Sequence, residues 1–144
     1  MRTTAAVALG ILAVACSSLS PASIKPGDVC DNCGALITNL TVAAEAVNAN
    51  GAPLRFDSPE CMARYLTRHA DAMAGLYVTD YDSGRLVRAE AATFVRTDRK
   101  DKPGERVHYA FTDVRRASEF AKDNSSTAVD WLTIIRQARA ASAN

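Results

Sequence analysis

The residues of this chain that could do chemistry are sulfur-bearing and lie in two short segments. The first is the run CDNCG, with Cys30 and Cys33, and the second holds Cys61 beside Met62. A CxxC spacing allows two thiolates to bind one metal ion or to form one disulfide. Gly34 allows the backbone to turn directly after the pair. The two segments predict a metal site, a thiol–disulfide redox site or a structural disulfide.

The number of thiols favours the metal site. Cys16 belongs to a leader, described below, so the mature chain has three cysteines, and three cannot all pair within a monomer. An unpaired thiol beside a CxxC fits Cu(I), which two or three sulfur ligands satisfy. Cys61 is a candidate third ligand, because the first turn of its predicted helix lowers a thiol pKa. Met62 could add a thioether. The alternative for Cys61 and Met62 is core packing.

Zinc is the alternative metal, and it requires four ligands. His69 lies eight residues beyond Cys61, about 12 Å along one helix. It is therefore predicted to be a half-buried helix residue and not a ligand, while His108 remains a possible fourth ligand. A thioredoxin-like redox site would place its CxxC at the start of a helix, but the run GALI after Cys33 does not begin one. We find no nucleophile–base–orienter set, and we therefore predict that the protein is not an enzyme.

The first 15 residues read as a signal peptide. Arg2 provides a positive charge, and the apolar run AAVALGILAVA ends directly before Cys16 and is too short to span a bilayer. Small residues before a cysteine are typical of a bacterial lipobox, which predicts lipidation of Cys16. Residues 16–27 are then expected to form a flexible tether. Ser17 favours sorting to the outer membrane, with the protein facing the periplasm. Ordinary secretory cleavage is the alternative.

Length and charge limit the remaining possibilities. The chain has 144 residues, a formal net charge of +1 and 48% hydrophobic residues. A net charge near zero gives no reason to expect a nucleic-acid partner. The length fits one domain or two small subdomains with a hydrophobic core.

The mature chain predicts an α+β fold made of two similar halves. In the first half, strands are expected at 42–47, 53–56 and 76–81, with an Asn50-Gly51 hairpin turn and a helix from Pro59 to about Ala70, capped by Ser58. In the second half, strands are expected at 91–96, 106–111 and 128–129, with helices capped by Asp113 and Asp130. We predict two tandem ββαβ units, 28–82 with the cysteine site and 83–144 with a C-terminal helix.

Several motifs, in this order, resemble the NosL family. They are CDNCGALI at 30–37, AAE at 43–45, FDSPECMARYL at 56–66, AATFV at 91–95 and YAF at 109–111. The resemblance implies a bacterial lipoprotein with two ββαβ units, related to a domain of organomercurial lyase. It also implies a copper chaperone that carries Cu(I) to nitrous oxide reductase, or to its assembly machinery, for the copper-sulfide centre used in denitrification.

Two positions depart from the family pattern. Ala35 stands where the family usually has methionine after Cys-Gly, and the loop with Lys102-Pro103-Gly104 lacks the methionine often found there. The family's methionine ligands therefore cannot be transferred to this chain. A thiol–disulfide redox protein, and a lipid-anchored structural or binding module with a CxxC disulfide, remain the alternatives to a copper chaperone.

Overall fold

The computed structural model of the protein describes residues 20–143. The expected signal peptide and Cys16 lie outside this range, so the structure does not address the lipid anchor. None of the helices formed by the described residues has both the length and the apolar character needed to cross a membrane.

The first half of the chain forms a four-stranded antiparallel sheet. Its strands are β1 (Ala44–Asn48), β2 (Pro53–Phe56), β3 (Met73–Thr79) and β4 (Leu86–Arg88), in the order β2-β1-β3-β4. The turn between β1 and β2 is the predicted one. Gly51 has a φ of +81°, and the Asn48 side chain accepts hydrogen bonds from the backbone of Asn50 and Ala52.

Helix α1 (Pro59–Arg68) connects β2 to β3 and carries Cys61. It begins as predicted, because Ser58 accepts a hydrogen bond from the Cys61 N–H at 3.1 Å and Pro59 occupies the first turn. It ends at Arg68, two residues before the expected end, because His69 takes an extended conformation.

The second half forms a three-stranded antiparallel sheet with two helices. The strands are β5 (Thr93–Asp98), β6 (Arg106–Phe111) and β7 (Ala128–Asp130), in the order β6-β5-β7, and the helices are α2 (Val114–Asp123) and α3 (Trp131–Ser142). Asp113 and Asp130 cap these helices, as the sequence predicts. Two short 3₁₀ turns, at Leu40–Val42 and Ala89–Ala91, precede β1 and β5.

The two halves share one topology, which confirms the predicted α+β fold with two ββαβ units. The order β2-β1-β3 in the first sheet matches β6-β5-β7 in the second. Phe56 pairs with the first residue of β1, Phe111 pairs with the first residue of β5, and both aromatic side chains are fully buried. Strand β4 was not predicted. It joins the first sheet although it lies beyond residue 82, where the first unit was expected to end.

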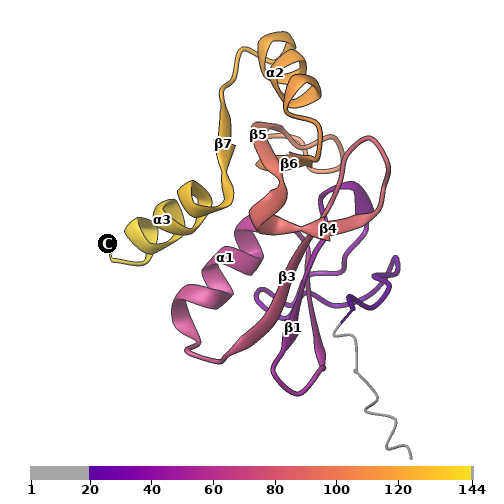
Figure 1. Cartoon of the computed structure of the whole chain (residues 1–144), viewed down its shortest axis with the longest axis vertical. Coiled ribbons are helices and arrows are strands. Elements are labelled where there is room, and N and C mark those ends of the chain that lie inside the picture. Colours follow the sequence, from indigo (N-terminus) through magenta and orange to yellow (C-terminus); the bar gives the residue numbers. More distant parts are fainter. Residues whose placement is uncertain (1–19, 144) are drawn as a thin grey trace, which may run out of the picture.

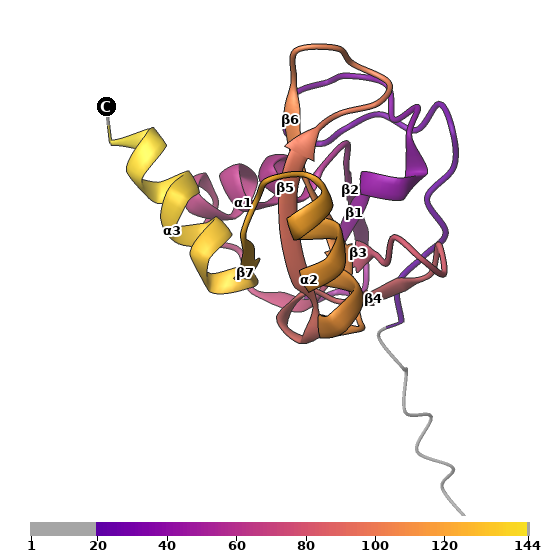
Figure 2. The same ribbon diagram turned by 90° about the horizontal axis from the view of Figure 1, so that it is seen from above.

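The helices divide the hydrophobic core into two parts. Helices α1 and α3 lie side by side (Figures 1 and 2), and Trp131 and Ile134 of α3 join the core that contains α1 and the first sheet. Helix α2 packs against β5, where Ala117 and Ala121 contact a smaller core with Phe111. The larger core includes residues of both sheets, so the two units are fused.

Hydrogen bonds reinforce the junction between the sheets. The Tyr81 N–H donates to the Ala110 carbonyl at 2.8 Å, and the buried Asp80 carboxylate accepts from the Thr112 N–H at 2.8 Å. The loop after β3 is thereby bonded to the end of β6.

The segment before the cysteines lies against the first unit. The Ala22 N–H donates to the buried carboxylate of Glu45 on β1 at 2.6 Å, and Ile24 packs against the larger core. Residues 22–24 are thus packed on the domain, whereas the sequence analysis expected a flexible tether there.

Candidate metal centre

Three thiols converge at one end of helix α1. The sulfur atoms of Cys30, Cys33 and Cys61 all lie within 4.8 Å of one another, and those of Cys33 and Cys61 are 3.8 Å apart. Cys30 and Cys61 are buried, at 1% and 4% exposure, while Cys33 is exposed. The structure therefore brings together the three cysteines that the sequence singled out, and one of them is open to solvent.

The CxxC segment is a tight turn between two bridged residues. The Cys30 N–H donates to the Ala35 carbonyl at 2.8 Å, and the Gly34 N–H donates to the Cys30 carbonyl at 2.9 Å. Gly34 has a φ of +74°, a conformation that favours glycine. Val29 and Leu36 form a β-bridge at the base of the turn. This geometry presents Cys33 at the tip and turns Cys30 inward.

A residue within the CxxC attaches the turn to the first sheet. The Asp31 N–H donates to the Arg55 carbonyl at 2.8 Å, and the Asp31 carboxylate accepts from the Arg55 N–H at 2.6 Å. The Arg55 side chain forms an ion pair with Asp28 at 3.2 Å. These bonds hold the turn against β2, so the CxxC reaches the start of α1.

The pKa values of the two buried thiols are shifted in opposite directions. A hydrogen bond from Cys61 lowers the pKa of Cys30 to about 7, against the effect of burial, and the backbone N–H groups of Asp57, Cys33 and Asn32 lower it further. The same hydrogen bond, together with burial, raises the pKa of Cys61 above its ordinary value. The expectation of a lowered Cys61 pKa was therefore wrong, because these two effects outweigh the helix dipole.

Arg64 is the cation of the site, and the sequence analysis missed it. Its guanidinium donates to the Cys61 sulfur at 3.4 Å, which acts to lower the Cys61 pKa. Arg64 lies three residues after Cys61, one helical turn away. That spacing is the signal that could have identified it.

A buried charge network supports the start of α1. The Arg99 guanidinium donates to both carboxylate oxygens of Asp57 at 2.7 and 2.8 Å and also pairs with Asp101, while Lys102 donates to Asp57 at 2.8 Å. Although burial acts in the opposite direction, these bonds lower the pKa of Asp57. Asp57 directly precedes the cap residue Ser58, so the network fixes the part of the chain between Cys30 and Cys61. Sequence reasoning did not identify this network.

The other candidate ligands have different surroundings. Met62 is fully buried in the larger core, a position consistent with packing, and its role as a ligand stays a prediction. His69 is exposed and not half-buried, because it lies at the C-cap of α1 and stacks on Tyr65 with 3.9 Å between ring centroids. His108 is buried, and its Nδ1 lies 2.6 Å from the Glu60 carboxylate.

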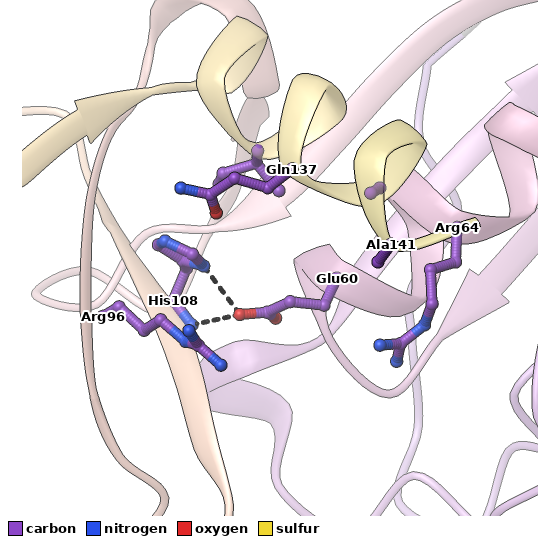
Figure 3. A pocket seen from close by; sticks show the side chains of 8 residues that line it. Glu60, Arg64, Arg96, His108, Gln137 and Ala141 are labelled. Carbon is purple, nitrogen blue, oxygen red and sulfur yellow. Dashed lines mark hydrogen bonds and ion pairs between the residues drawn. The ribbon is translucent and has the colours of Figure 1, made fainter. Parts of the chain in front are cut away.

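A pocket of about 260 Å³ lies behind the thiol cluster, between α1, β5, β6 and α3. Glu60 accepts hydrogen bonds from both the backbone and the ring of His108 there (Figure 3). Arg64 lines this pocket and also contacts Cys61, so it lies between the pocket and the sulfur site. Arg96 and Gln137 line the same pocket (Figure 3).

The NosL family model matches residues 21–138, which include both sheets and all three thiols. The chain belongs to the NosL family. Among solved structures, the chain is similar to the crystal structure of the copper chaperone NosL from Shewanella denitrificans, with a TM-score of 0.66 at 16% sequence identity. That similarity covers 78% of this chain and 92% of the Shewanella chain. At this identity the likeness establishes a shared NosL fold. No curated protein matches the sequence.

Proposed function

We propose that this NosL-family protein is a copper chaperone that binds one Cu(I) through Cys30 and Cys33, with Cys61 as third ligand. The observation that carries the proposal is the mutual distance of the three sulfur atoms, at most 4.8 Å. One ion placed among three sulfur atoms at this spacing can contact all of them after small side-chain rotations. Met62 is a further candidate ligand.

The chemistry of the donor set favours Cu(I). Soft thiolates select Cu(I), and two or three of them complete its coordination. A structural zinc site requires four ligands. His69 lies at the far end of α1, and the ring Nδ1 of His108 lies 2.6 Å from the Glu60 carboxylate. The name of the Shewanella structure, a copper chaperone, supports the same choice.

The arrangement also suits delivery of the metal. Cys33 is exposed on a tight turn, so a recipient could approach the ion from that side while Cys30 and Cys61 hold it from within. We propose that the recipient is apo-nitrous oxide reductase or its assembly machinery, and that the protein faces the periplasm on a lipid anchor at Cys16. The role is metal transfer, without a catalysed reaction.

The test is a competition titration of the reduced protein, without its leader, against a chromogenic Cu(I) chelator. We expect one Cu(I) per chain. The Cys30→Ser/Cys33→Ser double variant should lose tight binding, Cys61→Ser should bind more weakly, and His69→Ala, the matched control, should bind as the parent does. Unchanged affinity in the double variant would place the site elsewhere and refute the proposal.

Two further measurements test the finer parts of the proposal. A parallel titration with Zn²⁺ should give weaker binding than Cu(I), because the cluster supplies three sulfur ligands. Mass spectrometry of the protein from bacterial membranes should find a lipidated Cys16 as the first residue. A soluble product that begins elsewhere would exclude the anchor and leave the copper site untouched.

A further inference from the structure

We propose that Cys33 and Cys61 form a reversible disulfide, and that this disulfide switches the metal site off. The effect on the metal rests on the proposed function, whereas the disulfide chemistry does not.

The geometry favours this pair. Their sulfur atoms are 3.8 Å apart, and a disulfide needs about 2.0 Å, a change within reach of side-chain rotation. Cys33 is exposed at the tip of a turn, so its side chain can rotate and can be attacked from solvent. Cys61 lies on α1 and is buried. One accessible thiol thus faces one buried thiol.

The oxidant is a small-molecule disulfide, and the reaction is a two-electron exchange. The Cys33 thiolate attacks one sulfur of the oxidant, forms a mixed disulfide and releases the first thiolate. Cys61 then loses its proton and attacks the Cys33 sulfur, forms the Cys33–Cys61 bond and releases the second thiolate. The two protons lost by the cysteines are taken up by the released thiolates. The protein thiols are oxidised and the oxidant is reduced to two thiols.

Oxidation would remove two of the three sulfur ligands at once. Cys30 would remain as the single thiolate, and one thiolate does not complete the coordination of Cu(I). Conversely, a bound ion would occupy the sulfur of Cys33 and slow its attack on the oxidant. The same cluster would therefore bind copper when reduced and reject it when oxidised.

The sequence gives the experiment a clear readout. Trypsin cleaves after Arg55 and Arg64, so Cys61 lies in the peptide 56–64, while Cys30 and Cys33 lie together on the peptide that ends at Arg55. The metal-free reduced protein is equilibrated with mixtures of reduced and oxidised glutathione, free thiols are alkylated, and the digest is analysed by mass spectrometry without reduction. We expect the two peptides to be joined, with Cys30 alkylated.

Cysteine variants show which two cysteines form the disulfide. Cys30→Ser should still form the cross-link, and the Cys30→Ser/Cys61→Ser double variant, the matched control, should stop at a glutathione adduct on Cys33. A Cys30–Cys33 loop within one peptide, a Cys30–Cys61 link, or glutathione adducts without an internal bond would each overturn the proposal.

A last pair of measurements tests the disulfide proposal independently of the proposed copper site. The oxidised parent should show no Cu(I) binding, and the Cu(I)-loaded parent should oxidise more than about tenfold more slowly than the metal-free protein, because the attacking thiolate is occupied. If the cross-link forms but the reduced protein binds no Cu(I), the disulfide stands and the proposed function fails. If the reduced protein binds Cu(I) but forms no cross-link, the proposed function stands and the disulfide proposal fails.

Discussion

Arg99 and Asp57 form a two-point ion pair, in which the guanidinium donates to both carboxylate oxygens at 2.7 and 2.8 Å. Arg99 follows β5 in the second unit, and Asp57 lies between β2 and α1 in the first. Their side chains are 0% and 4% exposed. Because the Asp57 backbone also contacts the buried Cys30, the pair connects the second unit to the position of the thiols.

Removing this pair should destabilise the whole domain. We expect Arg99→Ala to lower the free energy of unfolding by about 3–5 kcal/mol, because the buried Asp57 would lose the partner that bonds both of its carboxylate oxygens and keep only the partly exposed Lys102. Urea denaturation followed by circular dichroism measures the loss. The control is Arg106→Ala, which removes an exposed pair with Asp98 and should cost less than about 1 kcal/mol. An equal cost in both variants would contradict the structural role of Arg99.

The same network predicts sensitivity to acid. Arg99 lowers the pKa of Asp101, and the bonds from Arg99 and Lys102 lower that of Asp57 despite its burial. A lowered folded-state pKa gives stability that is complete above the unfolded value, about 3.9, and is lost as the pH falls through the folded values. Unfolding free energy should therefore drop below about pH 4. In Arg99→Ala this drop should be shallower, and an unchanged profile would rule out the network as its source.

Sequence could predict those parts of the fold that depend on residues close together in the chain. The Asn50-Gly51 turn, the Ser58 cap and the order of strands and helices each arise from residues within a few positions of one another, and the structure contains them. Strand β4 has three residues and no alternating pattern. It forms because the edge of β3 offers backbone partners, which is a tertiary effect.

The supporting residues of the thiol cluster could not be predicted for a related reason. Asp57 and Arg99 are 42 residues apart, and Glu60 and His108 are 48 apart. Each residue taken alone is an ordinary charged or polar side chain in a loop, helix or strand. Their pairing depends on how the second unit packs on the first, whereas the cysteines were identifiable because their residue type and spacing carry chemistry of their own.

Glu45 should produce a pH dependence of the opposite sign. Burial raises the pKa of this carboxyl, although the hydrogen bond from the Ala22 N–H acts to lower it. A raised folded-state pKa gives stability that is present below the unfolded value, about 4.3, and is lost as the pH rises through the folded value. We expect Glu45→Gln to gain stability relative to the parent as the pH rises above about 4.3.

Denaturation of both proteins at a series of pH values measures this gain. Glu90→Gln is the matched control, because the Glu90 side chain is 51% exposed in its ion pair. Its effect on stability should be less than about 1 kcal/mol, since an exposed ion pair contributes little. A pH-independent difference between Glu45→Gln and the parent would exclude Glu45 as the titrating group.

The Glu60–His108 contact should act on stability and not on copper binding. Glu60 accepts from the His108 N–H at 2.8 Å and lies 2.6 Å from the ring Nδ1 (Figure 3). Glu60→Ala should cost about 2–4 kcal/mol, because both groups of His108 lose their acceptor while buried. Glu60→Gln, which keeps an acceptor oxygen, should cost less. Thermal denaturation measures both, and neither variant should change the number of Cu(I) ions bound. A lost ion would make His108 or Glu60 part of the metal site.

The last prediction concerns Arg64, whose guanidinium lies 3.4 Å from the Cys61 sulfur. Three thiolates around one Cu(I) carry a net negative charge, and a neighbouring cation offsets it. Arg64 also favours the thiolate form of Cys61, whose pKa the hydrogen bond with Cys30 and burial raise. We expect Arg64→Ala to weaken Cu(I) binding at pH 7 by about tenfold, equivalent to about 1.4 kcal/mol, the low end for a hydrogen bond to a charged group.

The control for Arg64→Ala is Arg96→Ala, because Arg96 lines the same pocket from β5 (Figure 3). Removing its charge should leave Cu(I) affinity within about twofold of the parent, since surface charges act weakly through solvent. Arg64→Lys, which keeps the charge, should recover part of the affinity. The titrations are repeated at pH 9, where the deficit of Arg64→Ala should persist, because the raised pKa of Cys61 keeps the metal-free thiol protonated at both pH values. An affinity loss of equal size in both alanine variants would mean that the pocket's overall charge acts on the ion, and not the contact between Arg64 and Cys61.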